Sequence, residues 1–521
     1  MSKTESMRIL KGLEKSKQFW FAIFTAFLFF LLRLPSLFEP LWYGDEGIYQ
    51  VIGNSLNHGK LLYSQVFDNK PPFLYWVYAI FQSDQFTIRL VSLIFGVLSV
   101  AVFFLLSKRL FENKKSNNIS YLTTFVFAVL FGLPVLEGNI ANAENFMLLP
   151  ILTAALIISN LKSSVSLQRD QISNFKLFAA GILLGIAFLF KIVAIFDLSA
   201  FLVFYFILNF DSLKKAIKLI TFPHKKLNLQ TKLRELQKAL NKISKIFIGF
   251  FLPIFLIALF FITNGTFVDF VKAVFLANVS YVNYGNKIGS LPLLLFIKLA
   301  LLGGFLVFVL AKRKKINHTT LFISIWFAFS LFNAFFSQRP YTHYLLVLIP
   351  SLSLMIGLIL FDKKYQKITA VIFLVTFLIV AIKFGILKSN KGIHYYQNFI
   401  SYVMNGKTST SYQAFFDRNT PFDYEIARFI KPKLNTHDTI FLWGNNAQLY
   451  QLIGVTAPTK YVVAYHITNY KDGSATTQTG IKINKPKFIV VMSNAGPIPF
   501  PLINYSKKID INNASIYERI F

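Results

Sequence analysis

The chain has 521 residues, of which 55% are hydrophobic and 60 are Phe, and its formal net charge is +31 at pH 7. This composition excludes an ordinary soluble globular protein and is typical of a polytopic membrane protein. The basic residues cluster in short runs between apolar segments, which indicates membrane topology rather than a nucleic-acid partner, and the absence of cysteine excludes disulfides and thiolate metal sites.

A basic stretch precedes the first apolar segment. Five lysines and arginines lie between residues 3 and 17, ahead of a Phe- and Leu-rich run at about 19–35. No small-residue cleavage site follows this run, so we expect a retained first span rather than a removed signal peptide. The positive charges place the N-terminus in the cytoplasm.

The first loop, about 36–86, is too polar to cross the membrane, and we expect short interfacial helices in it. It carries the carboxylate pair Asp45-Glu46, bracketed by Gly44 and Gly47, which allow a tight backbone turn. A lone acidic pair at a membrane surface is usually a solvated loop. Here aromatic residues suited to an interface or to sugar stacking lie beside it, namely Trp42, Tyr43 and Tyr49.

Apolar segments continue to about residue 387, and the basic runs between them indicate which ends lie inside. The run 177–210 is too long for one span of ~20 residues, so we divide it at Lys191. The predicted spans are about 19–35, 87–107, 119–136, 146–161, two within 177–210, 246–263, 291–311, 318–336, one ending before Lys363, and 368–387. Eleven spans put the C-terminus outside.

The segment 211–245 is strongly basic, and its apolar residues from Leu229 to Ile246 form one helical stripe. We expect this helix to lie on the cytoplasmic leaflet, with its lysines toward anionic lipid head groups.

The character of the chain changes at about residue 388, where polar residues and turn signals increase. We expect a small extracytoplasmic α/β domain over 388–521. Phe422–Ile430 and Ala447–Ile453 are predicted helices, while the β-branched runs Lys460–Ala464 and Phe488–Met492 are predicted buried strands.

The pattern of the first loop resembles that of the GT-C glycosyltransferases, in particular the bacterial protein O-mannosyltransferases and aminoarabinose transferases that use polyprenyl-phosphate sugars. The matching positions are Arg33, Pro35, Asp45-Glu46, Tyr49, Gly59, Lys70-Pro71 and Tyr75-Trp76. The resemblance implies a plasma-membrane enzyme whose catalytic domain is 1–387. It would transfer a sugar, with inversion, to an acceptor hydroxyl of a lipid, protein or wall glycan on the extracytoplasmic face.

Sugar transfer from a polyprenyl phosphate needs a base for the acceptor hydroxyl and donors for the leaving phosphate. Asp45 is the candidate base, and Glu46 would position the backbone or the acceptor. Lys70 is the candidate phosphate ligand, although a lysine here could equally extend to a lipid head group. Relatives often have an acidic residue, usually Asp, near the position of Glu144, and the resemblance therefore makes Glu144 a candidate donor or substrate ligand. The alternative is that Glu144 is a solvated loop carboxylate.

A turn before the tenth span supplies further candidates. Arg339 and His343 lie one helical turn apart, with Tyr341 between them, and could contact the donor phosphate. The alternative is a helix N-terminus with ordinary interface residues.

We expect no required cofactor. A divalent metal stays an open alternative, because Asp45, Glu46, Glu144 and His343 offer ligands, although no spacing is diagnostic. Aminoarabinose transferases have an acidic residue where Asn69 stands here. The competing function is a flippase or transporter of lipid-linked sugars, which would place charges within its spans and show paired halves. A non-catalytic scaffold would not explain the clustering of charged residues at one membrane face.

Overall fold

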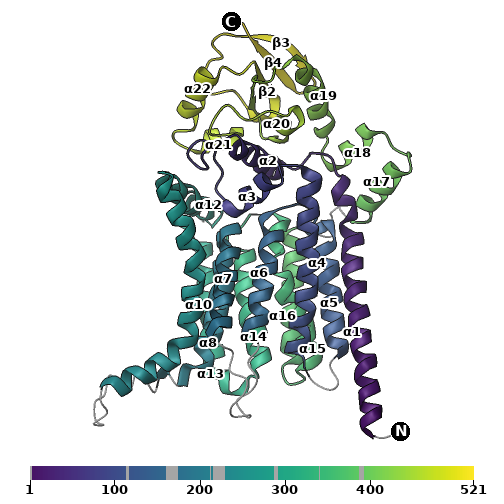
Figure 1. The fold of residues 1–521 in the computed structure, drawn as a ribbon, viewed down its shortest axis with the longest axis vertical. Helices are drawn as coiled ribbons and strands as arrows, with labels where there is room; N and C mark the ends of the chain where they lie inside the picture. The colour runs from purple at the N-terminus through teal and green to yellow at the C-terminus, as the bar shows by residue number, and fades with distance from the viewer. Residues whose placement is uncertain are drawn as a thin grey trace.

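The computed structural model describes residues 3–112, 117–159, 174–211, 213–214, 229–286, 291–339, 341–385 and 392–520. Within this part of the chain, eleven apolar helices form a bundle, five of them long enough to cross a membrane and six shorter (Figure 1). They are α1 (Lys3–Arg33), α4 (Gln85–Leu110), α5 (Asn117–Gly132), α6 (Ala143–Ile158), α7 (Asn174–Phe190), α8 (Ile195–Leu208), α10 (Leu229–Thr263), α13 (Leu293–Lys312), α14 (His318–Ala334), α15 (Ile349–Phe361) and α16 (Gln366–Lys383). Each expected span has its helix, and the helical membrane-protein fold is confirmed.

The long apolar run is divided at Lys191, as the sequence predicts. Lys191 has extended backbone (φ −155°, ψ 127°), and a short 3-10 turn separates it from α8. This conformation interrupts the helical hydrogen bonds and gives two short helices in place of one long one.

The expected amphipathic helix from Leu229 is the first part of α10, which continues into the membrane span without a break. Lys162, Arg169 and the basic residues of 215–228 lie outside the described residues.

The first loop forms the interfacial helices that the sequence predicts. A 3-10 turn (Leu34–Phe38) leads to α2 (Gly44–Asn57) and α3 (Pro72–Ile80). They lie at the end of the bundle remote from the N-terminus, between the bundle and the C-terminal region (Figure 1). The same end carries α11 (Phe267–Val271), a π-helical turn (Lys272–Leu276) and α12 (Ala277–Asn286).

The C-terminal region contains a four-stranded sheet in the order β1-β2-β4-β3. The β1 and β2 strands are parallel, with Ile440 opposite Phe488, and the other pairs are antiparallel. The elements are α17 (Ile393–Val403), α18 (Ser409–Phe416), α19 (Thr420–Ile430), β1 (Ile440–Trp443), α20 (Gln448–Ile453), α21 (Ala464–Asn469), α22 (Gly473–Asn484), β2 (Phe488–Met492), β3 (Tyr505–Ile511) and β4 (Ala514–Arg519). The small α/β domain is confirmed.

One predicted strand is wrong. Lys460–Ala464 is described in full and forms no strand. Its backbone instead bonds to two different segments: Phe67 N donates to Lys460 O at 3.0 Å, and Ala464 N donates to Gly444 O at 2.8 Å. The apolar residues of this run are buried without joining the sheet, because its backbone is bonded to the first loop and to the residue that follows β1.

Gly47 is the point at which the C-terminal domain docks on α2. A Cβ at Gly47 would lie 2.4 Å from the backbone nitrogen of Gln448, so a larger residue would displace α20. Further along the same pair of helices, Asn54 Nδ2 donates to Gln451 Oε1 at 2.8 Å. This glycine is therefore explained by a close approach between two backbones.

Candidate active site

Asp45 lies in the first turn of α2, the helix between the bundle and the C-terminal region (Figure 1). Its side chain is 36% exposed, and its Oδ2 lies 3.8 Å from Lys70 Nζ. Tyr49, one helical turn further on, donates its hydroxyl to the same oxygen at 3.2 Å. The Lys70 ammonium also lies 4.7 Å from the centroid of the Tyr49 ring. The structure thus brings together the carboxylate and the cation that the sequence singled out.

A second carboxylate, Asp68, also pairs with Lys70. Lys70 Nζ lies 3.5 Å from Asp68 Oδ2, and the Tyr75 hydroxyl donates to this oxygen at 2.7 Å. Burial raises the pKa of Asp68, but the Lys70 cation, His466 and the Tyr75 hydrogen bond together lower it below its ordinary value. Asp68 is therefore charged at neutral pH and fixes the lysine beside Asp45.

Glu46 points the opposite way, into the protein. Arg89 donates Nε to Glu46 Oε1 at 3.1 Å and Nη2 to Oε2 at 2.5 Å. The backbone N–H of Ala141 donates to Oε1 at 2.8 Å, and Arg89 Nη1 also pairs with Glu39 Oε2 at 2.9 Å. Adjacent residues of a helix point about 100° apart, which explains why only one of the two carboxylates faces the site. The enclosed Glu46 suits the positional role expected of it.

Glu144 forms a second charged group at the start of α6. Its Oε1 is ion-paired with Lys191 Nζ and lies 4.0 Å from His343 Nε2. Lys191 Nζ lies 4.2 Å from the centroid of the Tyr344 ring. The same ammonium interacts electrostatically with Lys70 and Asp45. Lys191, which the sequence analysis used only to divide two spans, thus borders the site.

His343 connects this group to the first loop. Its Nδ1 lies 2.8 Å from Glu137 Oε2, and the Tyr43 hydroxyl donates to the same oxygen at 2.9 Å. Glu137 has a left-handed backbone conformation (φ 57°) at the end of a 3-10 turn, which is uncommon for a residue with a side chain. No sequence motif pointed to Glu137.

The remaining predicted residues lie in the connection between α14 and α15. The Tyr341 ring is 47% exposed and stacks on the His343 imidazole at 5.6 Å between centroids. Arg339 is half-buried in the loop. The expected helical spacing of Arg339 and His343 is wrong, because Arg339 lies outside any helix and His343 lies in a 3-10 turn (Thr342–Leu345).

Among the described residues, no group of three or more His, Asp or Glu side chains is arranged to hold a metal ion.

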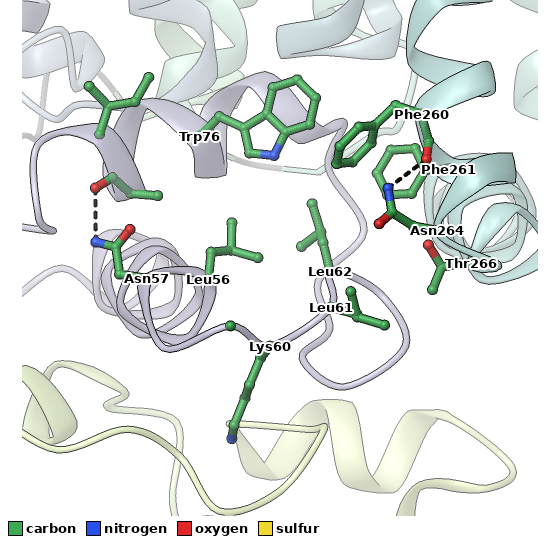
Figure 2. A pocket seen from close by; sticks show the side chains of 13 residues that line it. Leu56, Asn57, Lys60, Leu61, Leu62, Trp76, Phe260, Phe261, Asn264 and Thr266 are labelled. Carbon is green, nitrogen blue, oxygen red and sulfur yellow. Dashed lines mark hydrogen bonds between the residues drawn. The ribbon is translucent and has the colours of Figure 1, made fainter.

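A separate apolar pocket of about 490 Å³ lies at the other end of α2. Figure 2 shows Leu56, Trp76 and Phe260 around it, with the Lys60 amine directed away from it toward the C-terminal domain. At 1.5 Å per residue, Leu56 lies about 16 Å along the helix axis from Asp45. The pocket is therefore distinct from the charged site.

Comparisons with known proteins agree with this architecture. Residues 69–222 match the family model described as dolichyl-phosphate-mannose-protein mannosyltransferase. This range contains Lys70, Glu144 and Lys191. No curated protein matched the chain in a sequence search.

Two crystal structures of ArnT from Cupriavidus metallidurans share the fold. The structure bound to undecaprenyl phosphate is 15% identical, with a TM-score of 0.51 over 95% of this chain and 97% of that chain. The apo structure is 14% identical, with the same TM-score and coverage. An oligosaccharyltransferase from Archaeoglobus fulgidus is 14% identical over 92% of this chain and 70% of that chain. Its TM-score is 0.47.

The fold of ArnT thus extends over nearly the whole of this chain. Together with the family match over residues 69–222, it agrees with the resemblance seen in the first loop: this chain has the fold of ArnT and is similar to the mannosyltransferase family over that range.

Proposed function

We propose that this protein is a membrane glycosyltransferase that moves a sugar from a polyprenyl-phosphate donor to an acceptor hydroxyl. The observation that carries the proposal is the pair of Asp45 and Lys70. Their charged atoms lie 3.8 Å apart, and both side chains are partly exposed to solvent. A base for the acceptor hydroxyl and a cation for the leaving phosphate are the two groups that such a displacement needs. The ArnT structure that shares the fold was solved with undecaprenyl phosphate, which supports a lipid-phosphate donor.

In the proposed reaction Asp45 takes the proton of the acceptor hydroxyl as its oxygen attacks the anomeric carbon. The bond from that carbon to the phosphate oxygen breaks, and the polyprenyl phosphate leaves with the electron pair. Lys70 and Lys191 stabilise the charge that develops on the phosphate. A single displacement of this kind inverts the configuration of the sugar carbon. His343, Tyr341 and Arg339 would border the donor.

The donor site is tested by replacing Lys70 with Ala. A charge-assisted contact contributes about 1.5–3 kcal/mol, so affinity for polyprenyl phosphate should fall about ten- to a hundred-fold. Binding would be measured on purified protein, and transfer with a panel of radiolabelled polyprenyl-phosphate sugars.

Lys60→Ala is the matched control, because this lysine of the same loop donates to the carbonyl of Ala457 at the other end of α2. Equal donor affinity in wild type and Lys70→Ala would remove Lys70 from the donor site. If the wild type moves labelled lipid across vesicles but transfers no sugar, the protein is a flippase.

We propose that no metal is required, because phosphate is a good leaving group and two lysines lie beside the site. Transfer measured in excess EDTA should equal transfer measured without it. A loss of activity that Zn²⁺, Mg²⁺ or Mn²⁺ restores would contradict this.

We also propose that the site and the C-terminal domain face the outside of the cell. The chain has no cysteine, so single cysteines can report on each side. We expect a membrane-impermeant maleimide to label Lys508→Cys in intact cells, and Lys314→Cys only after the membrane is opened. Both side chains are well exposed, at 57% and 77%. Labelling of both positions in intact cells would contradict the orientation.

A further inference from the structure

The C-terminal domain contributes His466 of α21 to the charged site. This residue is 3% exposed, and its Nε2 lies 3.6 Å from Asp68 Oδ1. The imidazole packs edge-on against Phe67, with 5.5 Å between ring centroids, and against Tyr465 at 4.4 Å. His466 and Asp68 thus meet across the boundary between the domain and the first loop.

The two oxygens of Asp68 face different partners, and His466 is the partner of one of them. Its Oδ2 faces Lys70 and the Tyr75 hydroxyl, whereas its Oδ1 faces His466. Tyr75 and Lys70 hold one oxygen of this carboxylate, and the His466 ring lies 3.6 Å from the other, so the imidazole limits the space in which Asp68 can turn away from Lys70. Burial lowers the pKa of His466 to about 4, so the ring is neutral at pH 7. With its proton on Nε2, the neutral ring directs an N–H toward Asp68 Oδ1, and a shift of a few tenths of an ångström from the present 3.6 Å would bring the two atoms to hydrogen-bond distance.

Backbone contacts between the C-terminal domain and the first loop hold His466 next to Asp68. Phe67, the residue before Asp68, donates its backbone N–H to Lys460 O at 3.0 Å. Gly47 lies against the backbone of Ala447 and Gln448. The domain therefore contacts the first loop at two places, one close to Asp45 in the chain and one next to Asp68, which favours a rigid site.

We propose that His466 is a positioning residue, which acts through Asp68 to hold Lys70 where the donor phosphate binds. The C-terminal domain is then a part of the catalytic unit. This inference rests on the proposed glycosyltransferase function.

The test compares two substitutions of His466. His466→Phe keeps a ring between Phe67 and Tyr465 but has no N–H, whereas His466→Gln keeps an amide N–H that can reach Asp68. Because small displacements of catalytic groups cost up to about a hundred-fold, we expect His466→Phe to lower kcat/KM about ten- to a hundred-fold and to weaken binding of polyprenyl phosphate. His466→Gln should keep most of both.

The control is Asn54→Ala, which removes a hydrogen bond from the same interface away from Asp68 and should leave transfer unchanged. A second arm combines His466→Phe with Asp68→Asn. If His466 acts through Asp68, the double variant should be no less active than Asp68→Asn alone.

Three results would overturn the proposal: full activity in His466→Phe, additive losses in the double variant, or a parallel loss of thermal stability and activity in both His466 variants. A parallel loss of stability and activity would mean that His466 only fills space in the domain interface and does not position Asp68. Absence of sugar transfer by the wild type from every donor would instead overturn the proposed function.

Discussion

Replacing Asp45 by Asn is expected to lower the rate of sugar transfer by about 10²–10⁴-fold, the usual cost of losing a general base. Asn has the size of Asp, and its carbonyl oxygen can still accept the Tyr49 hydrogen bond. Lys70 stays paired with Asp68, so donor affinity should change little. The measurement is kcat for transfer beside the dissociation constant for polyprenyl phosphate.

Asp84→Asn is the matched control for this substitution. Asp84 belongs to the same loop, is exposed, and caps α4 by accepting from Thr87 N at 2.8 Å. Asn is an equally good cap, so this variant should transfer sugar as the wild type does. Full turnover in Asp45→Asn, beside an inactive Glu144→Gln that still folds, would assign the base to Glu144.

Much of the fold could be predicted from sequence because membrane spans depend on local composition. A helix in lipid satisfies its own backbone hydrogen bonds, so a run of apolar residues is sufficient to identify it. The division at Lys191 followed from length alone. The C-terminal sheet was harder to predict, because short apolar runs do not show whether a segment pairs in a sheet or packs elsewhere. Lys460–Ala464 was assigned wrongly for that reason.

The candidate site was predictable only where its parts lie on one loop. Asp45 and Lys70 could be paired because they stand at the same membrane face. That Glu46 turns inward depends on the rotation of α2 and on Arg89 in the next span. His466 comes from a domain hundreds of residues away, and only the docking of that domain brings it to Asp68. Lys191 is a lone cation in an apolar run, which is a feature that could indicate a functional residue. The same feature is equally well explained by a break between two membrane spans.

Arg89→Met is expected to lower the free energy of unfolding by about 3–5 kcal/mol, the usual cost of removing one partner from a buried ion pair. Arg89 is fully buried and is the cation that pairs with both Glu39 and Glu46. Without it, two carboxylates would stay in the interior beside each other. Thermal or denaturant unfolding of the purified protein in detergent would measure the loss.

Glu46→Gln should cost less, because Gln still accepts from Ala141 N and Arg89 keeps Glu39. Adding Glu46→Gln to Arg89→Met should recover part of the lost stability, since one uncompensated charge is removed, and such coupling is the signature of a direct pair. Turnover per folded molecule of Glu46→Gln should stay near that of the wild type. A stable Glu46→Gln protein without activity would contradict this assignment and give Glu46 a direct part in the chemistry.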